Sequence, residues 1–211
     1  MKTIWFIRHG ESQSNAGLKS SSASQTSLTS LGHQQATILP AAITRQPDLI
    51  VTSEYIRTLQ TAKFVFEKYP DVEHAVWPVH EYTYLNADKY RNTTSQERTA
   101  WAEEYWKSAD PDYVDGSQAE SFNQLLLRAQ NMLELIINSK ADFITVFSHG
   151  WFIRALLWQQ QRDSSIPMKF KAAQLHKLQV LKRKKLFSTR RLWVAKTFQP
   201  KKYMWHFLYF S

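Results

Sequence analysis

The sequence predicts an α/β fold, a three-layer α/β/α sandwich in which helices cover both faces of a mostly parallel central sheet. Short segments that are apolar throughout recur along the chain, a pattern typical of strands buried on both faces. Segments with apolar residues at helical spacing separate them, so strands and helices alternate. With 211 residues and 43% hydrophobic composition, the chain is long enough for a single domain over residues 1–211 with a substantial core.

The N-terminal part of the chain supplies a strand, a loop and a helix. Residues 2–8 contain an apolar run and form the first expected strand. Residues 13–27 are rich in serine and are expected to form a loop. Thr29 has the side chain of a helix N-cap, and we expect a helix from residue 30 that Pro40 kinks or shortens.

The middle of the chain continues this alternation and then loses it. Residues 49–53 form a second buried strand and residues 55–69 a helix, whereas the strand expected at residues 76–79 has a weak signal. Residues 82–118 are aromatic and charged without strand periodicity. We expect a lid-like insertion there, with a short helix around residues 97–106.

The last third of the chain contains the clearest helix. Residues 119–139 form this helix, and a buried strand at residues 143–147 and a helix at residues 151–160 follow. Beyond residue 169 the signal weakens. The pattern there favours a helix at residues 169–184 and a strand at residues 192–198.

Several residues suited to catalysis follow the expected strands. Two strands end in a histidine followed by glycine, at His9 and His149. Arg57 lies in the first turn of the helix after the second strand, and the weak third strand leads into Glu81. Ligands of open α/β sheets bind beyond the carboxyl ends of the strands. With Arg8, we expect two histidines, two arginines and one carboxylate to meet at that edge.

These residue types suit the transfer of a phosphoryl group. Arginine binds two phosphate oxygens at once through its planar fork. A neutral imidazole is a good nucleophile toward phosphorus and a good leaving group afterwards. A carboxylic acid protonates the departing alkoxide and then activates water. Arginine and a second histidine supply the electrostatic stabilisation, so this chemistry requires no metal.

The motifs around these residues resemble those of the histidine phosphatase superfamily, the phosphoglycerate mutase-like proteins. Five matching motifs occur in the family's order between residues 3 and 154, about three-quarters of the chain. They are Arg8-His9-Gly10-Glu11-Ser12 with Asn15, the segment from Leu28 to Ala36, the segment from Ser53 to Ala62, Glu120-Ser121 with Arg128, and Ser148-His149-Gly150.

The resemblance implies specific roles for the residues at the sheet edge. It implies a phosphoglycerate mutase-like fold, no cofactor, His9 as the nucleophile and Glu81 as the proton donor. The residues themselves leave Glu11 and Glu120 open as alternative acids. Beside His9 and Glu81, it implies a catalytic or phosphate-binding role for Arg8, Asn15, Arg57, His149 and Gly150.

The sequence also departs from particular branches of that family. The mutases follow the acid with a tyrosine-glycine and a glutamine-glycine-lysine segment, whereas here Glu81 is followed by Tyr82 and no glycine occurs before Gly116. A mutase activity is therefore the less favoured enzyme function. Glu11 and Ser12, which follow Arg8-His9-Gly10, also differ from the phytase and acid phosphatase branch. Trp151 stands where family members often have a second glycine.

The charge of the chain is concentrated at its C-terminal end. The net charge is +9, but residues 162–211 alone hold 13 Lys and Arg against one acid. Basic groups among aromatic residues suit nucleic-acid phosphates and bases. We favour the simpler interpretation, a solvated basic face whose aromatic residues pack on the domain. Nucleic-acid binding stays open as an alternative.

The composition excludes several kinds of site and several classes of protein. The chain has no cysteine, so disulfides, thiolate metal sites and a cysteine nucleophile are excluded. No stretch approaches the roughly 20 apolar residues that span a bilayer, and the apolar run near the N-terminus is too short for a signal peptide. We therefore expect a cytoplasmic protein with no membrane partner.

Together, these observations predict a metal-independent phosphomonoesterase that acts on a small phosphorylated substrate through a phosphohistidine on His9. Two alternatives remain: a phosphoglycerate-type mutase, and a non-catalytic protein that binds a phosphorylated ligand or RNA through the basic C-terminal segment. The sequence indicates neither the natural substrate nor the oligomeric state.

Overall fold

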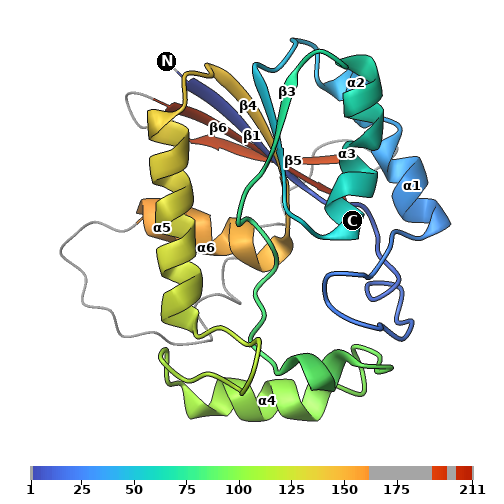
Figure 1. Cartoon of the computed structure of the whole chain (residues 1–211), viewed down its shortest axis with the longest axis vertical. Helices are drawn as coiled ribbons and strands as arrows, with labels where there is room; N and C mark the ends of the chain where they lie inside the picture. The colour runs from blue at the N-terminus through green and yellow to red at the C-terminus, as the bar shows by residue number, and fades with distance from the viewer. Residues whose placement is uncertain (1, 162–191, 199–202, 211) are drawn as a thin grey trace.

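A computed structural model describes residues 2–161, together with two strands at residues 192–198 and 203–210. The described residues form a six-stranded sheet in the order β3-β2-β4-β1-β6-β5 (Figure 1). All neighbouring strands pair in parallel except β5 and β6, which are antiparallel. The strands are β1 (Lys2–Arg8), β2 (Leu49–Thr52), β3 (Glu73–Val76), β4 (Phe143–Ser148), β5 (Leu192–Phe198) and β6 (Tyr203–Phe210).

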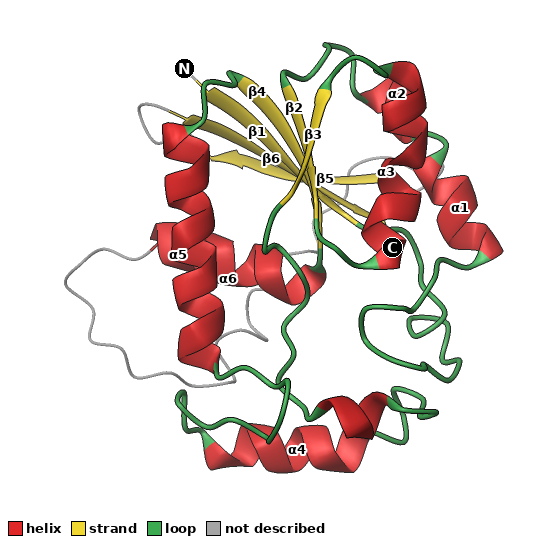
Figure 2. Ribbon diagram, viewed as in Figure 1, coloured by secondary structure: helices red, strands yellow, loops and turns green. Residues whose placement is uncertain are grey.

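Helices lie on both faces of this sheet (Figure 2), which confirms the predicted fold class. They are α1 (Ser30–Ala36), α2 (Leu39–Ala42), α3 (Ile56–Lys68), the 3₁₀ turn η1 (Ala87–Tyr90), α4 (Thr99–Ser108), α5 (Phe122–Asn138) and α6 (Gly150–Gln161). The segment that carries η1 and α4 lies apart from the sheet, beyond the carboxyl ends of its strands (Figure 1).

The core has two parts because successive side chains of a strand point to opposite faces. Phe6 of β1 belongs to the cluster under α5 and α6, which includes Leu125 and Phe152. The next residue, Ile7, belongs to the cluster under α2 and α3, which includes Leu39. All five side chains are fully or almost fully buried. The strands are therefore apolar on both faces, as their sequence predicts.

Capping residues and a proline mark where several helices begin. The Thr29 side chain accepts a hydrogen bond from the Gly32 N–H and caps α1. Pro40 lies in the first turn of α2, so the expected long helix is divided into α1 and α2. A capping box formed by Ser121 and Gln124 begins α5.

The prediction requires two corrections, one misplaced strand and one strand that it lacks. The third strand occupies Glu73–Val76 rather than residues 76–79, because β3 is a largely exposed edge strand whose side chains carry little apolar signal. The sequence analysis identified no strand after residue 198, yet β6 lies in the sheet between β1 and β5. The helix expected at residues 169–184 lies outside the described residues. Of the helices described, none has the length and apolarity needed to cross a membrane.

Candidate active site

The sheet brings the two predicted histidines together. Arg8 is paired with Ser148 in the parallel register of β1 and β4, so the residue after each is a histidine at the same edge. The ring centroids of His9 and His149 lie 5.1 Å apart. The exposed fractions are 4% for His9 and 0% for His149. Two imidazoles thus share one enclosed space.

The orientation of the His9 ring is set by a backbone carbonyl. Its Nδ1 lies 2.7 Å from the carbonyl oxygen of Gly10. A carbonyl oxygen only accepts hydrogen bonds, so Nδ1 carries the proton of the neutral ring and Nε2 keeps a lone pair. Burial, and then the nearby Arg57 and Arg8, lower the pKa of His9 well below its usual value. His9 is therefore neutral at neutral pH, with Nε2 available as a nucleophile.

The ring of His149 is held through Nε2, whereas that of His9 is held through Nδ1. The Nε2 of His149 lies 2.8 Å from the Ser53 hydroxyl, which also contacts the Thr58 hydroxyl at 2.8 Å. The Nδ1 atom is buried and has no hydrogen-bond partner among the described residues. Burial, followed by the neighbouring Arg57 and His9, lowers the pKa of His149 well below its usual value. A buried polar atom without a partner is unfavourable, and an anion in this space would provide one.

Two arginines border the same space. Arg57 is 6% exposed; its guanidinium donates to the Ala23 carbonyl at 2.5 Å and lies 4.7 Å from the centre of the Tyr55 ring. Burial lowers the pKa of Arg57 to about 10, so it is still a cation at neutral pH. The Nε of Arg8 is buried without a hydrogen-bond partner among the described residues. Fixed positive charge beside a neutral imidazole is the environment that a phosphate dianion needs.

The glycines after the two histidines allow close approach of neighbouring groups. A Cβ atom on Gly10 would lie only 2.6 Å from the carbonyl oxygen of Gly32, so no side chain fits at Gly10. At Gly150 a Cβ atom would meet Arg8 Nε at 3.5 Å and Glu81 Oε2 at 3.9 Å. Arg8 and Glu81 therefore converge on the open face of Gly150.

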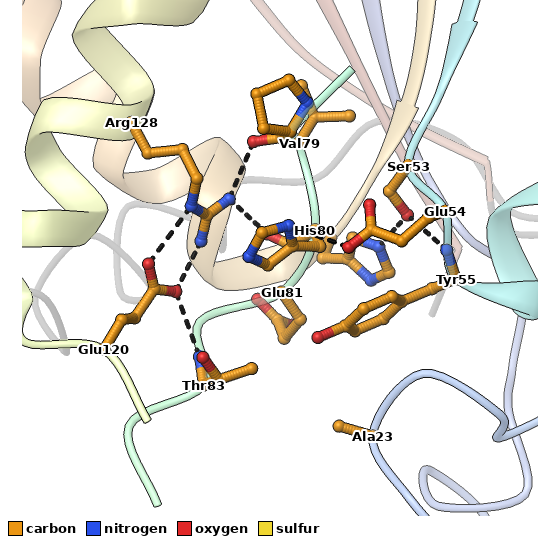
Figure 3. Close-up of polar contacts among 12 residues, drawn as sticks. Ala23, Ser53, Glu54, Tyr55, Val79, His80, Glu81, Thr83, Glu120 and Arg128 are labelled. Atoms are coloured by element: carbon orange, nitrogen blue, oxygen red, sulfur yellow. Dashed lines mark hydrogen bonds and ion pairs between the residues drawn. The ribbon is translucent and has the colours of Figure 1, made fainter. Parts of the chain in front are cut away.

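Glu81 reaches the site from a segment without helix or strand. Its Oε1 accepts hydrogen bonds from the backbone N–H groups of Trp151, at 2.9 Å, and Tyr82, at 3.1 Å. These bonds hold Glu81 at the start of α6, with its Oε2 3.9 Å from the position that a Cβ atom on Gly150 would take. In Figure 3 the Glu81 side chain is drawn between His80 and the ring of Tyr55.

The structure does not bring every candidate to this space. Asn15 is exposed, and its side-chain oxygen accepts from the N–H and hydroxyl of Ser12; its role as a phosphate contact stays a prediction. Of the two alternative acids, Glu11 accepts from the Thr29 hydroxyl, and both oxygens of Glu120 are bonded to Arg128. Within the part of the chain that the structure describes, no cluster of three or more His, Asp or Glu side chains is arranged to hold a metal ion.

Sequence reasoning missed residues that act on these side chains. Ser53 was recognised as a strand end, but its contact with His149 depends on β2 lying beside β4. His80, the residue before Glu81, is another: its Nδ1 lies 3.1 Å from Glu54, and its ring stacks on Tyr55 (Figure 3). The motif that contains Ser53 was a usable signal, whereas no local signal pairs His80 with Glu54.

Comparison with known proteins identifies a family whose model matches most of the chain. Residues 4–187 match the model of the histidine phosphatase superfamily (branch 1). Over 123 residues, the chain is 32% identical to the adenosylcobalamin/alpha-ribazole phosphatase of Salmonella typhi. That match covers 55% of this chain and 60% of the Salmonella protein, so the chain spans less than two thirds of this relative.

Solved structures share the fold. A putative alpha-ribazole-5'-P phosphatase from Escherichia coli K-12 is 25% identical, with a TM-score of 0.60 over 74% of this chain and 77% of that one. A phosphoserine phosphatase variant from Entamoeba histolytica in complex with phosphoserine is 22% identical. Its TM-score is 0.62, covering 83% of this chain and 84% of the amoebal one.

Proposed function

The chain belongs to the histidine phosphatase superfamily, and on that basis we propose that it is a metal-independent phosphomonoesterase that works through a phosphohistidine on His9. The observation that carries the proposal is the hydrogen bond from His9 Nδ1 to the Gly10 carbonyl inside a buried, cationic space. That bond leaves the Nε2 lone pair as the nucleophile. The substrate is a small phosphorylated molecule.

In the first step, the phosphoryl group of the substrate lies between the guanidiniums of Arg8 and Arg57 and the ring of His149. The His9 Nε2 lone pair attacks phosphorus, and the bond from phosphorus to the leaving-group oxygen breaks. Glu81, in its protonated form, gives its proton to that oxygen, so an alcohol departs. The phosphoryl group is then bound to His9.

In the second step, Glu81 acts as the base. Its carboxylate takes a proton from water, the water oxygen attacks phosphorus, and the bond from phosphorus to Nε2 breaks. Inorganic phosphate leaves, and both His9 and Glu81 return to their starting states. The arginines and His149 stabilise the developing charge, which is the part that a metal ion plays in other phosphatases.

The test is hydrolysis of phosphomonoesters in the presence of EDTA. An aryl phosphate, phosphoserine and alpha-ribazole phosphate make a suitable first panel, because the last two come from the named relatives. The wild-type protein is expected to turn over at least one of them without metal and to form an acid-labile, base-stable phosphoenzyme. His9→Ala should abolish both, while His33→Ala on α1 serves as the control.

Other outcomes distinguish the alternatives. Full activity in His9→Ala would refute the proposal. Isomerisation of a phosphoglycerate in place of net phosphate release would indicate a mutase. Absence of turnover on the whole panel, together with binding of RNA that weakens steeply with salt, would indicate a binding protein.

A further inference from the structure

The segment that carries Glu81 has no secondary structure of its own to fix its position. Residues 77–86 form neither helix nor strand. A carboxylic acid that protonates a leaving group must be placed within hydrogen-bond reach of one particular oxygen. Contacts from other parts of the fold must therefore hold this segment in place.

Several of those contacts come from one largely shielded ion pair, Arg128 of α5 with Glu120 just before it, and others come from β2, β4 and α6. Arg128 and Glu120 bind each other through two hydrogen bonds, 3.2 Å from Nε to Oε2 and 2.5 Å from Nη2 to Oε1. Their side chains are 12% and 13% exposed. The Arg128 guanidinium also lies 4.9 Å from the centre of the Phe152 ring on α6. A bidentate, shielded pair of this kind is rigid, unlike an exposed surface pair.

The pair binds the backbone on both sides of Glu81 (Figure 3). On the N-terminal side, Nη1 of Arg128 donates to the carbonyl oxygens of Pro78, at 3.0 Å, and His80, at 2.9 Å. On the C-terminal side, Oε1 of Glu120 accepts from the N–H of Thr83 at 3.2 Å, and the backbone N–H of Glu120 donates to the Thr83 carbonyl at 2.9 Å. Residues immediately before and shortly after Glu81 are thus held by α5 and by a residue that leads into it.

We propose that the Arg128–Glu120 pair is a positioning device for the proton donor, and that it acts on the reaction only through Glu81. This inference rests on the proposed function. Neither side chain has a contact with His9, His149 or Arg57 among the hydrogen bonds of the described residues. Loss of the pair leaves the phosphate site intact and moves the carboxyl group away from the leaving oxygen.

A leaving-group comparison separates this role from a general loss of structure. An aryl phosphate with a stable phenolate leaving group departs as an anion and needs no proton, whereas an alkyl phosphate requires one. The value of kcat/KM reports only the steps up to phosphoenzyme formation, so the second role of Glu81 as a base does not affect it. The ratio of kcat/KM for the aryl and alkyl substrates therefore measures the placement of the acid.

The experiment compares variants on both substrates. Glu81→Gln is expected to lower kcat/KM for the alkyl phosphate ~10²–10⁴-fold, which is the contribution of general acid catalysis. The value of kcat/KM for the aryl phosphate should stay within a few-fold of the wild-type value. Arg128→Met is expected to lower the alkyl value ~10–10²-fold, because an ångström of misplacement has that effect. Glu120→Gln, which keeps an acceptor for Thr83, should show the same selectivity with a smaller loss and provides the test if Arg128→Met fails to fold.

Two comparisons complete the design. Arg91→Met removes an exposed arginine–aspartate pair on η1 and should change neither value. In a Glu81→Gln background, Arg128→Met should add no further selective loss, because the two act through one group.

Each result decides between the two hypotheses. A loss of equal size on both substrates in Arg128→Met or Glu120→Gln, with the selective loss present in Glu81→Gln, overturns the positioning inference alone. No selectivity in Glu81→Gln, with His9→Ala inactive, overturns both the proton-donor assignment and the inference. Activity in His9→Ala overturns the proposed mechanism itself.

Discussion

Acidification below about pH 6.5 is expected to destabilise the folded protein through His9 and His149. Both imidazoles are buried, and their pKa values in the folded state lie well below the value of about 6.5 for an unfolded chain. The unfolded state therefore binds protons that the folded state does not accept. The stability contributed by these neutral rings is complete above the unfolded pKa and is lost as the pH falls below it.

The size of the effect follows from this proton difference. Each excluded proton reduces the free energy of unfolding by about 1.4 kcal/mol per pH unit below the unfolded pKa. One unit below that pKa, the two histidines together contribute a loss of about 3 kcal/mol. That is a large fraction of the ~5–15 kcal/mol by which domains are stable.

Urea unfolding in phosphate-free buffer at about pH 7.5 and pH 5.5 measures this loss. For His9→Gln and His149→Gln, the free energy of unfolding at one pH is subtracted from that at the other. Any effect of the substitution that is the same at both pH values therefore cancels. Each variant should lose about 1.4 kcal/mol less than the wild type on acidification. If both variants lose as much as the wild type, the two imidazoles titrate as in the unfolded chain, and our account of the buried site is refuted.

Three further changes probe the site directly. Arg57→Met removes the buried guanidinium that we propose binds phosphate. It should raise KM for phosphate monoesters ~10–10²-fold, because hydrogen bonds to charged groups are worth about 1.5–3 kcal/mol; an unchanged KM would place phosphate elsewhere. Ser53→Ala leaves His149 Nε2 without its partner and should lower the free energy of unfolding by about 1–3 kcal/mol in urea titrations, with Ser21→Ala, at an exposed loop position, as a control. Gly10→Ala forces a Cβ against the Gly32 carbonyl, and we expect a loss of about 1–3 kcal/mol; a variant of wild-type stability and activity would contradict the close packing at this turn.

Local sequence signals predicted much of the fold correctly. The bounds of β1 and β5 agree with the expected residues, because a run of apolar residues between polar ones marks a strand without reference to the rest of the chain. Thr29 and Pro40 act on neighbouring backbone atoms, so the start of α1 and its separation from α2 were also visible. The predicted position of the edge strand β3 is three residues too far along the chain, because its exposed side chains leave little apolar pattern.

The sequence by itself determined which chemical groups the site contains and at which strand ends they occur, because residue type and local pattern are properties of neighbouring positions. Only the tertiary structure decided how those groups are held. The bond from Ser53 to His149 joins residues 96 apart, and the bond from Trp151 to Glu81 joins residues 70 apart. Strand order and helix packing create these contacts, so the orientation of His149 and the position of Glu81 depend on the folded chain as a whole.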